Sequence, residues 1–185
     1  GFPATVCVAV NEQVVHGIPD DRRVEEGDII GLDLGAYKHG YYGDAARTLP
    51  VGEVSPEAKK LMRVTKESLD EGIKKAITGN RLTDISHSIQ NHVELNQFSV
   101  VEQYVGHGIG RKMHEAPQVP NFGAPGRGPR LKKGMTLAIE PMVNVGGYEV
   151  KVLSDNWTVS TSDGSLSAHY EDTIAITEGE PLILT

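Results

Sequence analysis

The sequence has 185 residues, of which 38% are hydrophobic and 23% are charged, as expected for one globular domain covering residues 1–185. The net charge of −7 argues against a nucleic-acid-binding protein, which would need a basic face to meet phosphates. No apolar run approaches the 18 residues or so of a transmembrane helix. The single cysteine, Cys7, cannot form an internal disulfide and favours a reducing cytoplasm.

The first elements that the sequence predicts are strands. Residues 5–10 are apolar and mostly β-branched, with Val6, Val8 and Val10 on one face and small residues on the other, which suits the wall of a pocket. Because the chain begins at Gly1 without an initiator Met and enters this strand almost at once, we expect an N-terminally truncated domain. Residues 28–37 and 40–49 alternate like two further strands, separated by Lys38-His39.

Two helices are predicted next. Ser55 is a suitable N-cap, Pro56 suits the first helical position, and apolar residues then recur at helical spacing until Gly79, which predicts a helix over 56–78. A second apolar pattern with a four-residue repeat predicts a helix over 83–95.

The rest of the chain is predicted to be mainly strands. They are expected near residues 98–107, 135–143, 148–153, 157–161 and 166–176, with a Gly/Pro/Arg-rich loop at 121–130 and a tight turn at Asp163-Gly164 between the last two strands. Strands, two helices and then strands again predict an α+β fold, an antiparallel sheet backed by helices.

Three acidic residues lie inside runs whose neighbours favour burial: Asp33, Glu140 and Glu171. An ionised carboxylate is too costly to bury unless it is paired or binds a cation, and Lys and Arg are scarce in these runs. Any one of the three could instead lie on a surface strand beside an unfavourable neighbour. Three in one small chain make that explanation poor.

The spacing of Asp33 and Asp44 adds a geometric argument. A hairpin that turns at Lys38-His39 would place the two carboxylates directly opposite each other on one face of the sheet, with Cβ atoms roughly 5 Å apart. Two like charges at that distance are destabilising unless a positive charge lies between them, and a divalent cation supplies it.

His107 lies between glycines in the sequence GHGIG of residues 106–110, which lets backbone and ligand approach closely. An isolated histidine is more often a core residue, but beside four buried acids it is a candidate metal ligand. Four carboxylates and one imidazole suit Mn(II), Fe(II) or Co(II). Four negative charges balance two divalent ions, with a bridging water or hydroxide left as the nucleophile.

Together with these residues, several motifs resemble the type I methionine aminopeptidases of metallopeptidase family M24 along essentially the whole chain. The motifs are Asn11-Glu12-x-x-x-His16-Gly17-Ile18-Pro19-Asp20, Gly106-His107-Gly108-Ile109-Gly110-Arg111-x-x-His114-Glu115, Glu140-Pro141-Met142 and Ser165-Leu166-Ser167-Ala168-x-Tyr170-Glu171. The five ligands alone would indicate only the wider pita-bread superfamily. The resemblance implies the pita-bread (creatinase/aminopeptidase-like) fold, here without the family's N-terminal helical segment.

The resemblance also implies roles for individual residues. The metal ligands would be Asp33, Asp44, His107, Glu140 and Glu171, with Asp44 and Glu171 bridging two ions and Glu140 also acting as general base. His16 and His114 would contact the scissile amide, and Phe2, Cys7, Met113 and Trp157 would line the methionine pocket. Without the resemblance, the two histidines would be ordinary loop residues and Trp157 a packing aromatic. His39, His87 and His92 are interpreted as solvated.

The implied reaction is hydrolytic release of the N-terminal methionine from chains whose second residue is small. Its cofactors would be two divalent ions, Co, Mn or Fe(II), with a monovalent cation near Asn11 and Ser167. Its partners would be nascent polypeptide N-termini near the ribosome in the cytoplasm, with no nucleic-acid specificity, no membrane contact and a monomeric state when intact.

Three departures from the family pattern stand out. Met113 replaces a frequent aromatic residue and should make the pocket more pliable. His169 replaces a usual glutamine on the same strand face as Glu171, where it could perturb the surroundings of the metal ligands. The N-terminal segment is missing, so we expect Val6, Val8 and Val10 to be exposed and the isolated chain to be poorly stable or self-associating.

Three rival interpretations stay open. A proline-specific dipeptidase would lack the HGIPD stretch and normally carries a large N-terminal domain. A non-enzymatic peptide-binding protein of this fold would have lost metal ligands, and none is lost here. A split or truncated chain would fold correctly only with the missing segment.

Overall fold

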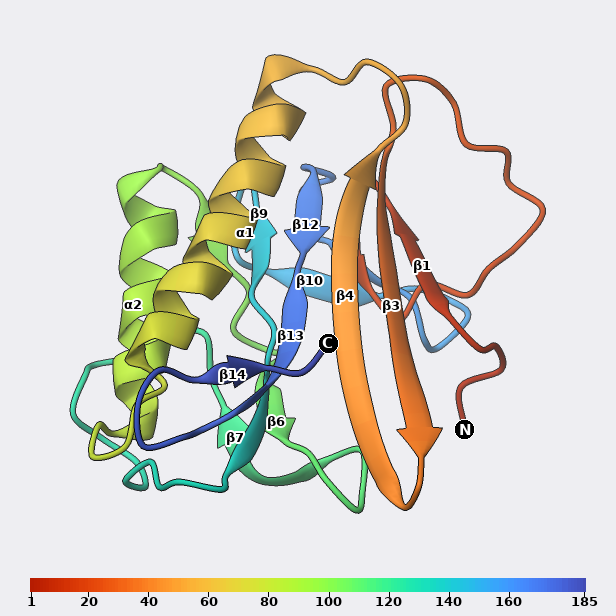
Figure 1. Ribbon diagram of the computed structural model, residues 1–185. Coiled ribbons are helices and arrows are strands. Elements are labelled where there is room, and N and C mark those ends of the chain that lie inside the picture. The colour runs from red at the N-terminus through yellow and green to blue at the C-terminus, as the bar shows by residue number, and fades with distance from the viewer.

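The computed structural model describes all residues from Gly1 to Thr185 and consists of three antiparallel sheets and two helices (Figure 1). The main sheet has eight strands in the order β1-β3-β4-β13-β8-β6-β7, with β14 paired to β13. Two three-stranded sheets have the orders β10-β11-β2 and β12-β9-β5. The strands are β1 (Cys7–Val10), β2 (Gln13–Val15), β3 (Ile29–Lys38), β4 (Tyr41–Pro50), β5 (Ser99–Val100), β6 (Gly106–Gly108), β7 (Glu115–Val119), β8 (Thr136–Ile139), β9 (Met142–Asn144), β10 (Val150–Val152), β11 (Val159–Thr161), β12 (Ser167–His169), β13 (Glu171–Ala175) and β14 (Leu182–Ile183).

The two helices, α1 (Pro56–Lys75) and α2 (Leu82–Leu95), begin close to where the sequence predicts. Ser55 caps α1 by accepting a hydrogen bond from the backbone N–H of Ala58 at 3.1 Å. The helix ends three residues earlier than expected, because the backbone N–H of Ala76 turns tightly back to the carbonyl of Ile73. Neither helix is long and apolar enough to cross a membrane.

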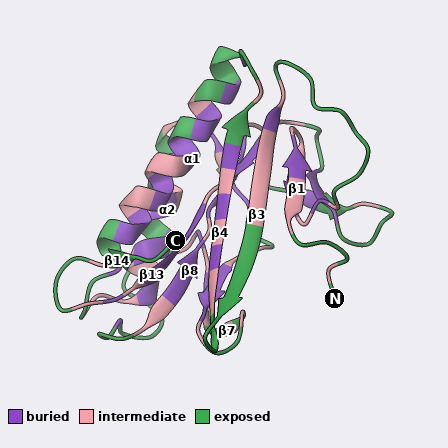
Figure 2. Cartoon of the chain, turned by 45° about the vertical axis from the view of Figure 1, so that its right-hand side comes forward, coloured by how far each residue is buried: buried purple, intermediate pink, exposed green.

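The main hydrophobic core lies between the helices and one face of the main sheet. Leu69 and Ile73 of α1 and Ile85 and Ile89 of α2 pack against apolar residues of β8 and β13. α1 lies against β13, β8 and the neighbouring β4, and α2 lies against β7, whereas β1 lies away from both helices (Figures 1 and 2). The opposite face of the sheet is therefore free to form a site.

The β3–β4 hairpin has a different register from the expected one. Its pairs run from Lys38–Tyr41 through Gly35–Asp44 to Asp33–Ala46, so the predicted direct pairing of Asp33 with Asp44 is wrong by two residues. The turn is formed by His39 and Gly40, whose φ angles of 51° and 88° suit a two-residue hairpin turn. Because strand side chains alternate with a period of two, the shift keeps both carboxylates on one face as diagonal neighbours.

The prediction that Val6, Val8 and Val10 are exposed is also wrong. Val8 and Val10 lie on the sheet face opposite the cavity, since Val8 pairs with Leu32 and Val10 with Ile30, whereas Val6 precedes the strand and lines the cavity. Val10 is buried and the other two are half-buried. The segment after β2 returns along the edge of β1, where the backbone N–H of Val8 donates to the carbonyl of Gly17 at 2.8 Å. On that face Leu34 and Leu49 are the more exposed, at 49% and 50%.

Several predicted strands are interrupted where the chain changes sheet. The expected strand 135–143 breaks at Glu140-Pro141, because proline cannot donate to a ladder, and the strand 166–176 breaks at Tyr170. β11 pairs with β10 and β2 and not with β12, so the expected hairpin at Asp163-Gly164 is wrong. The carboxylate of Asp163 instead accepts hydrogen bonds from backbone N–H groups of two loops.

Candidate metal centre

A cavity of about 580 Å³ opens on the face of the main sheet opposite the helices. All eleven side chains predicted for the site line it: Phe2, Cys7, His16, Asp33, Asp44, His107, Met113, His114, Glu140, Trp157 and Glu171. No lysine or arginine is among its lining residues. The cavity therefore gathers four carboxylates without a permanent positive charge to balance them.

The acidic residues come together because they occupy neighbouring strands. Asp33 lies on β3, Asp44 on β4 and Glu171 on β13, three strands that are consecutive in the sheet. His107 lies on β6, two strands further along, and Glu140 directly follows β8, which runs between β13 and β6. A single sheet face thus presents all five predicted ligands to one cavity.

Three of these side chains converge closely enough to share an ion. Ligand atoms of Asp44, His107 and Glu171 all lie within 4.8 Å of one another, and the three residues are at most 8% exposed. Oε1 of Glu140 lies 3.5 Å from Nε2 of His107. The group therefore has the donor atoms, spacing and seclusion that a metal site requires.

The orientation of His107 fits metal binding. Its Nδ1 lies 2.9 Å from the carbonyl oxygen of Gly108, and since a carbonyl can only accept, Nδ1 carries the hydrogen. Nε2 is then the unprotonated nitrogen and points toward the carboxylates. A backbone acceptor that fixes the other ring nitrogen in this way is the usual arrangement for a metal-binding histidine.

The electrostatics of the cavity favour a bound cation. Burial, followed by the negative charge of Asp44, raises the pKa of Asp33 to about 7. Burial and neighbouring carboxylates also raise the pKa values of Glu140 and Glu171 well above their usual range. Because Oε1 of Glu171 is buried without a hydrogen-bond partner, a ligand is needed to satisfy it. The residues present therefore fit divalent cations.

The two other predicted histidines border the same cavity. The ring of His114 lies 4.4 Å from that of His107, centre to centre. His16, in a left-handed conformation with a φ of 58°, contacts Tyr104 edge-on. Burial, followed by the neighbouring His114, lowers the pKa of His16, so this imidazole is neutral near pH 7.

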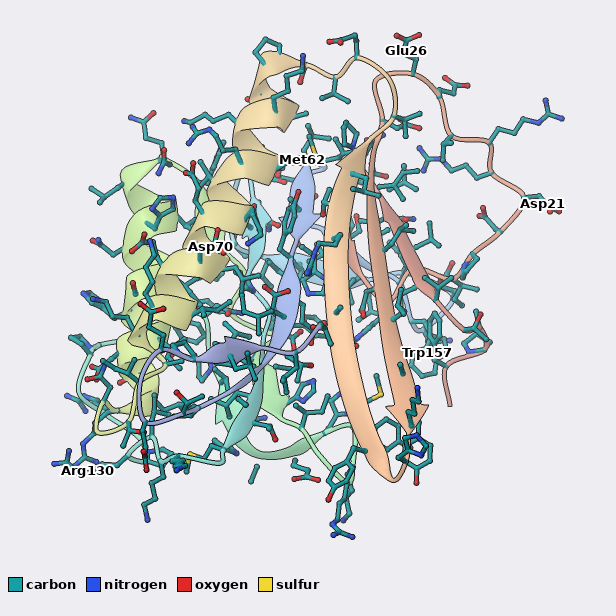
Figure 3. All side chains as sticks on the ribbon, viewed as in Figure 1. Asp21, Glu26, Met62, Asp70, Arg130 and Trp157 are labelled. Atoms are coloured by element: carbon teal, nitrogen blue, oxygen red, sulfur yellow. The ribbon has the colours of Figure 1, made fainter.

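The remaining lining residues form an apolar wall. Trp157 lies beside β1 and β3 near the start of the chain (Figure 3), and its ring meets that of Phe2 edge to face with centres 5.4 Å apart. Burial and the nearby carboxylates raise the pKa of Cys7 to about 12, which keeps its thiol neutral. Gly35 lies against Met113, so that a Cβ at position 35 would push aside the terminal methyl group of Met113.

Some residues around the site were not found from the sequence. Gly35 lines the cavity, Asn121 donates a hydrogen bond to the carbonyl of Glu140 at 3.0 Å, and Arg47 pairs with Asp172. Gly35 and Asn121 carry no local sequence signal that marks them as part of the site. The Arg47–Asp172 pair joins residues 125 positions apart.

The residues outside the centre are placed as follows. The carbonyl of Asn11 accepts a hydrogen bond from the backbone N–H of Ser167 at 2.9 Å, so the two residues predicted near a monovalent cation are neighbours. His39 and His87 are exposed, as expected. His92 is half-buried, and its ring nitrogen lies 3.2 Å from a carboxylate oxygen of Glu67, so its interpretation as merely solvated is wrong.

Comparisons with known proteins agree with this geometry. Residues 1–178 match metallopeptidase family M24. The chain is 62% identical to a methionine aminopeptidase of Clostridium acetobutylicum, over all of this chain and 74% of that protein. It is also similar to the crystal structure of a methionine aminopeptidase from Thermotoga maritima, with a TM-score of 0.94 and 54% identity over 96% of this chain and 72% of that one.

A more distant likeness concerns the fold alone. A prolidase structure from Pyrococcus horikoshii superposes with a TM-score of 0.75 at 23% identity, over 97% of this chain and 47% of that one. With the curved antiparallel sheet and its two helices, these neighbours confirm the expected pita-bread fold.

Proposed function

This chain belongs to the methionine aminopeptidases of metallopeptidase family M24, and from that premise we propose that it releases the N-terminal methionine of nascent proteins whose second residue is small. The observation that carries the proposal is the convergence of Asp44, His107 and Glu171 within 4.8 Å, in a cavity whose other end is apolar. One end of the cavity suits metal ions and the other suits an uncharged side chain.

Five side chains would hold two divalent ions in this proposal: Asp33, Asp44, His107, Glu140 and Glu171. Mn(II), Fe(II) and Co(II) suit this set of oxygen and imidazole donors. Bound there, the ions supply a Lewis acid for the scissile carbonyl and a water of lowered pKa. A monovalent cation near Asn11 and Ser167 is part of the same proposal.

The remaining steps belong to residues of the chain. Glu140 takes the proton of the attacking water as general base. His16 and His114 hold the scissile amide as its carbonyl oxygen becomes negative. Phe2, Cys7 and Trp157 enclose the methionine side chain and exclude water from it. Nascent chains near the ribosome in the cytoplasm are the proposed partners.

Metal analysis combined with a peptide assay tests this function. Purified protein should bind about two equivalents of a divalent ion and then release Met from Met-Ala-Ser. Removal of the metal with a chelator should abolish release, and readdition should restore it. Two controls separate the rivals, since a proline-specific dipeptidase would cleave Ala-Pro in preference and a peptide-binding protein would cleave neither substrate. Full metal occupancy without release of Met would contradict the proposal.

A further inference from the structure

The imidazole of His169 has no assigned partner although it is buried beside the metal centre. His169 ends β12, and its side chain is 4% exposed. Its Nε2 atom makes no hydrogen bond with the rest of the chain. An unpaired buried polar atom costs roughly 1–3 kcal/mol, so a partner for this nitrogen is expected.

The backbone of His169 is held rigidly, so the ring has a fixed position. The hydroxyl of Thr48 on β4 accepts from the backbone N–H of His169 and donates to its carbonyl, both at 2.9 Å. The hydroxyl of Tyr170 donates to the carbonyl of Thr48 at 2.7 Å. This bracing occurs where the chain passes from β12 to β13, the strand that carries Glu171.

Glu140 lies between two imidazoles. Its Oε1 is 3.5 Å from Nε2 of His107, and its Oε2 is 3.9 Å from Nε2 of His169. Nε2 of His107 is an acceptor, so it cannot donate to Oε1, and a cation is needed between these two atoms. Oε1 is therefore the oxygen that faces the metal centre.

The other oxygen, Oε2, is the one that lies nearer His169. A neutral imidazole carries one N–H, and Nε2 is the ring nitrogen of His169 that faces Oε2. A distance of 3.9 Å is too long for a hydrogen bond, but a small rotation of the carboxylate would close it. Such a bond would satisfy the unpaired nitrogen.

We propose that His169 is a positioning residue for Glu140: its Nε2–H holds Oε2 of the carboxylate, so that Oε1 faces the metal centre. This inference rests on the proposed function of Glu140 as the base. The inference gives the two oxygens of the Glu140 carboxylate different partners, the metal centre for Oε1 and His169 for Oε2. The list of metal ligands alone does not make this distinction. The effect is on the orientation of Glu140 and not on substrate affinity.

Nitrogen NMR of the histidine rings tests the inference without any turnover. In ¹⁵N-histidine-labelled protein loaded with a diamagnetic divalent ion, the chemical shifts of His169 should be those of the tautomer with hydrogen on Nε2. Assignment would come from the loss of one ring signal in His169→Gln. An Nε2 atom without hydrogen would overturn the inference, whatever the activity of the protein.

Kinetics of three variants test the consequence. His169→Leu removes the donor at similar volume, and its kcat on Met-Ala-Ser should fall about 10–100-fold, with KM within about threefold and metal content unchanged. His169→Gln keeps an N–H at the end of the side chain and should recover to within about threefold of wild type, whereas the shorter His169→Asn should not. His92→Leu, on α2, serves as the matched control and should retain wild-type kcat.

Each alternative outcome has a definite meaning. Wild-type kcat in His169→Leu, equal losses in the Leu and Gln variants, or a loss explained by missing metal would each overturn the positioning role. If His169→Leu does not fold, the comparison of Gln with Asn decides the question. An inactive wild-type protein with bound metal would instead contradict the proposed function, while the NMR result would still report on His169.

Discussion

Asp172, directly after Glu171 in β13, forms an ion pair with Arg47 of β4 across the two strands that carry two of the candidate metal ligands. Asp172 is almost completely buried, and Arg47 also donates to the carbonyl oxygens of Ala46 and Glu171. The ladder between β4 and β13 has only two residue pairs. Arg47 therefore stabilises the short pairing of β4 with β13, on the sheet face opposite the carboxylates of Asp44 and Glu171.

We expect Arg47→Ala to lower the free energy of unfolding by about 3 kcal/mol, because it leaves the Asp172 carboxylate buried without a partner. The double variant Arg47→Met, Asp172→Leu removes both charges and should recover most of this loss. Urea unfolding of the metal-free proteins measures both values. Lys59→Ala, which breaks an exposed pair with Glu53, is the control and should change stability by less than about 1 kcal/mol. A double variant as unstable as the single one would show that the ion pair is not the cause.

Glu140→Gln tests the general base. The amide keeps an oxygen that can bind a cation but cannot take a proton, so kcat should fall roughly 10²–10⁴-fold while metal content is retained. Metal analysis of the same samples separates loss of the base from loss of the ions. The exposed Glu102→Gln is the matched control and should behave as wild type. Near-normal turnover with full occupancy would exclude this role for Glu140.

The metal-free protein should become less stable as the pH rises. The pKa of Asp33 is raised from 3.8 to about 7, so between these values the folded state binds a proton that the unfolded state has lost. The contribution of Asp33 to stability therefore falls from about pH 4 to pH 7 and levels off above that range. The raised pKa values of Glu140 and Glu171 act in the same direction. Burial lowers the pKa values of His16, His107 and His169 from 6.5, and these act in the opposite direction below that pH.

Thermal melting in the presence of a chelator, at pH 5 and pH 8, measures this effect. Tm should be lower at pH 8, and Asp33→Asn should reduce the difference. Added Mn(II) or Co(II) should raise Tm more at pH 8 than at pH 5, because ions bind the ionised carboxylates. An equal change of the metal-free Tm between these two pH values in the wild type and in Asp33→Asn would contradict the raised pKa of Asp33.

The pocket predicts moderate selectivity for the first residue of the substrate. Cys7, Met113 and Trp157 offer apolar, partly flexible contacts, and the thiol is neutral. Changing the length or branching of an apolar side chain in such a pocket is worth about 1–3 kcal/mol, so kcat/KM for Met-Ala-Ser should exceed that for Leu-Ala-Ser by roughly 10–200-fold. Lys-Ala-Ser and Glu-Ala-Ser should be much poorer. Similar values for all four peptides would refute the pocket assignment.

The candidate residues of the site were predicted from the sequence, whereas the register of the β3–β4 hairpin that carries two of them was predicted wrongly. Asp33, Glu140 and Glu171 were recognisable because carboxylates are out of place in apolar runs, and the error of two residues in the hairpin left the side chains on the correct face. The turn itself was mistaken because Lys38-His39 and His39-Gly40 are both polar pairs. Only the preference of glycine for positive φ distinguishes them.

Other features depended on contacts that local patterns do not encode. β2, β9 and β12 have three residues each, too few for a periodic signal, and they form because neighbouring segments supply partners. His169 was noted as a departure from the family pattern. That its nitrogen lacks a partner beside Glu140 follows only from the packed structure.

An exposed apolar surface on β3 and β4 leads to the last prediction. Figure 2 shows exposed stretches on both strands. On the sheet face opposite the cavity, Leu34 and Leu49 are 49% and 50% exposed, beside half-buried Ile30 and Leu32. Apolar patches beyond a few hundred Å² are unusual on monomers and promote association. Sedimentation velocity should therefore show concentration-dependent self-association of these 185 residues. Leu49 lies outside the cavity, and Leu49→Glu should weaken this self-association, because a charged side chain resists burial and the chain is already acidic. Leu95→Glu, at the end of α2, is the control and should have no effect on self-association. A protein that sediments as a monomer at all concentrations, or equal responses to the two substitutions, would show that this face does not drive association.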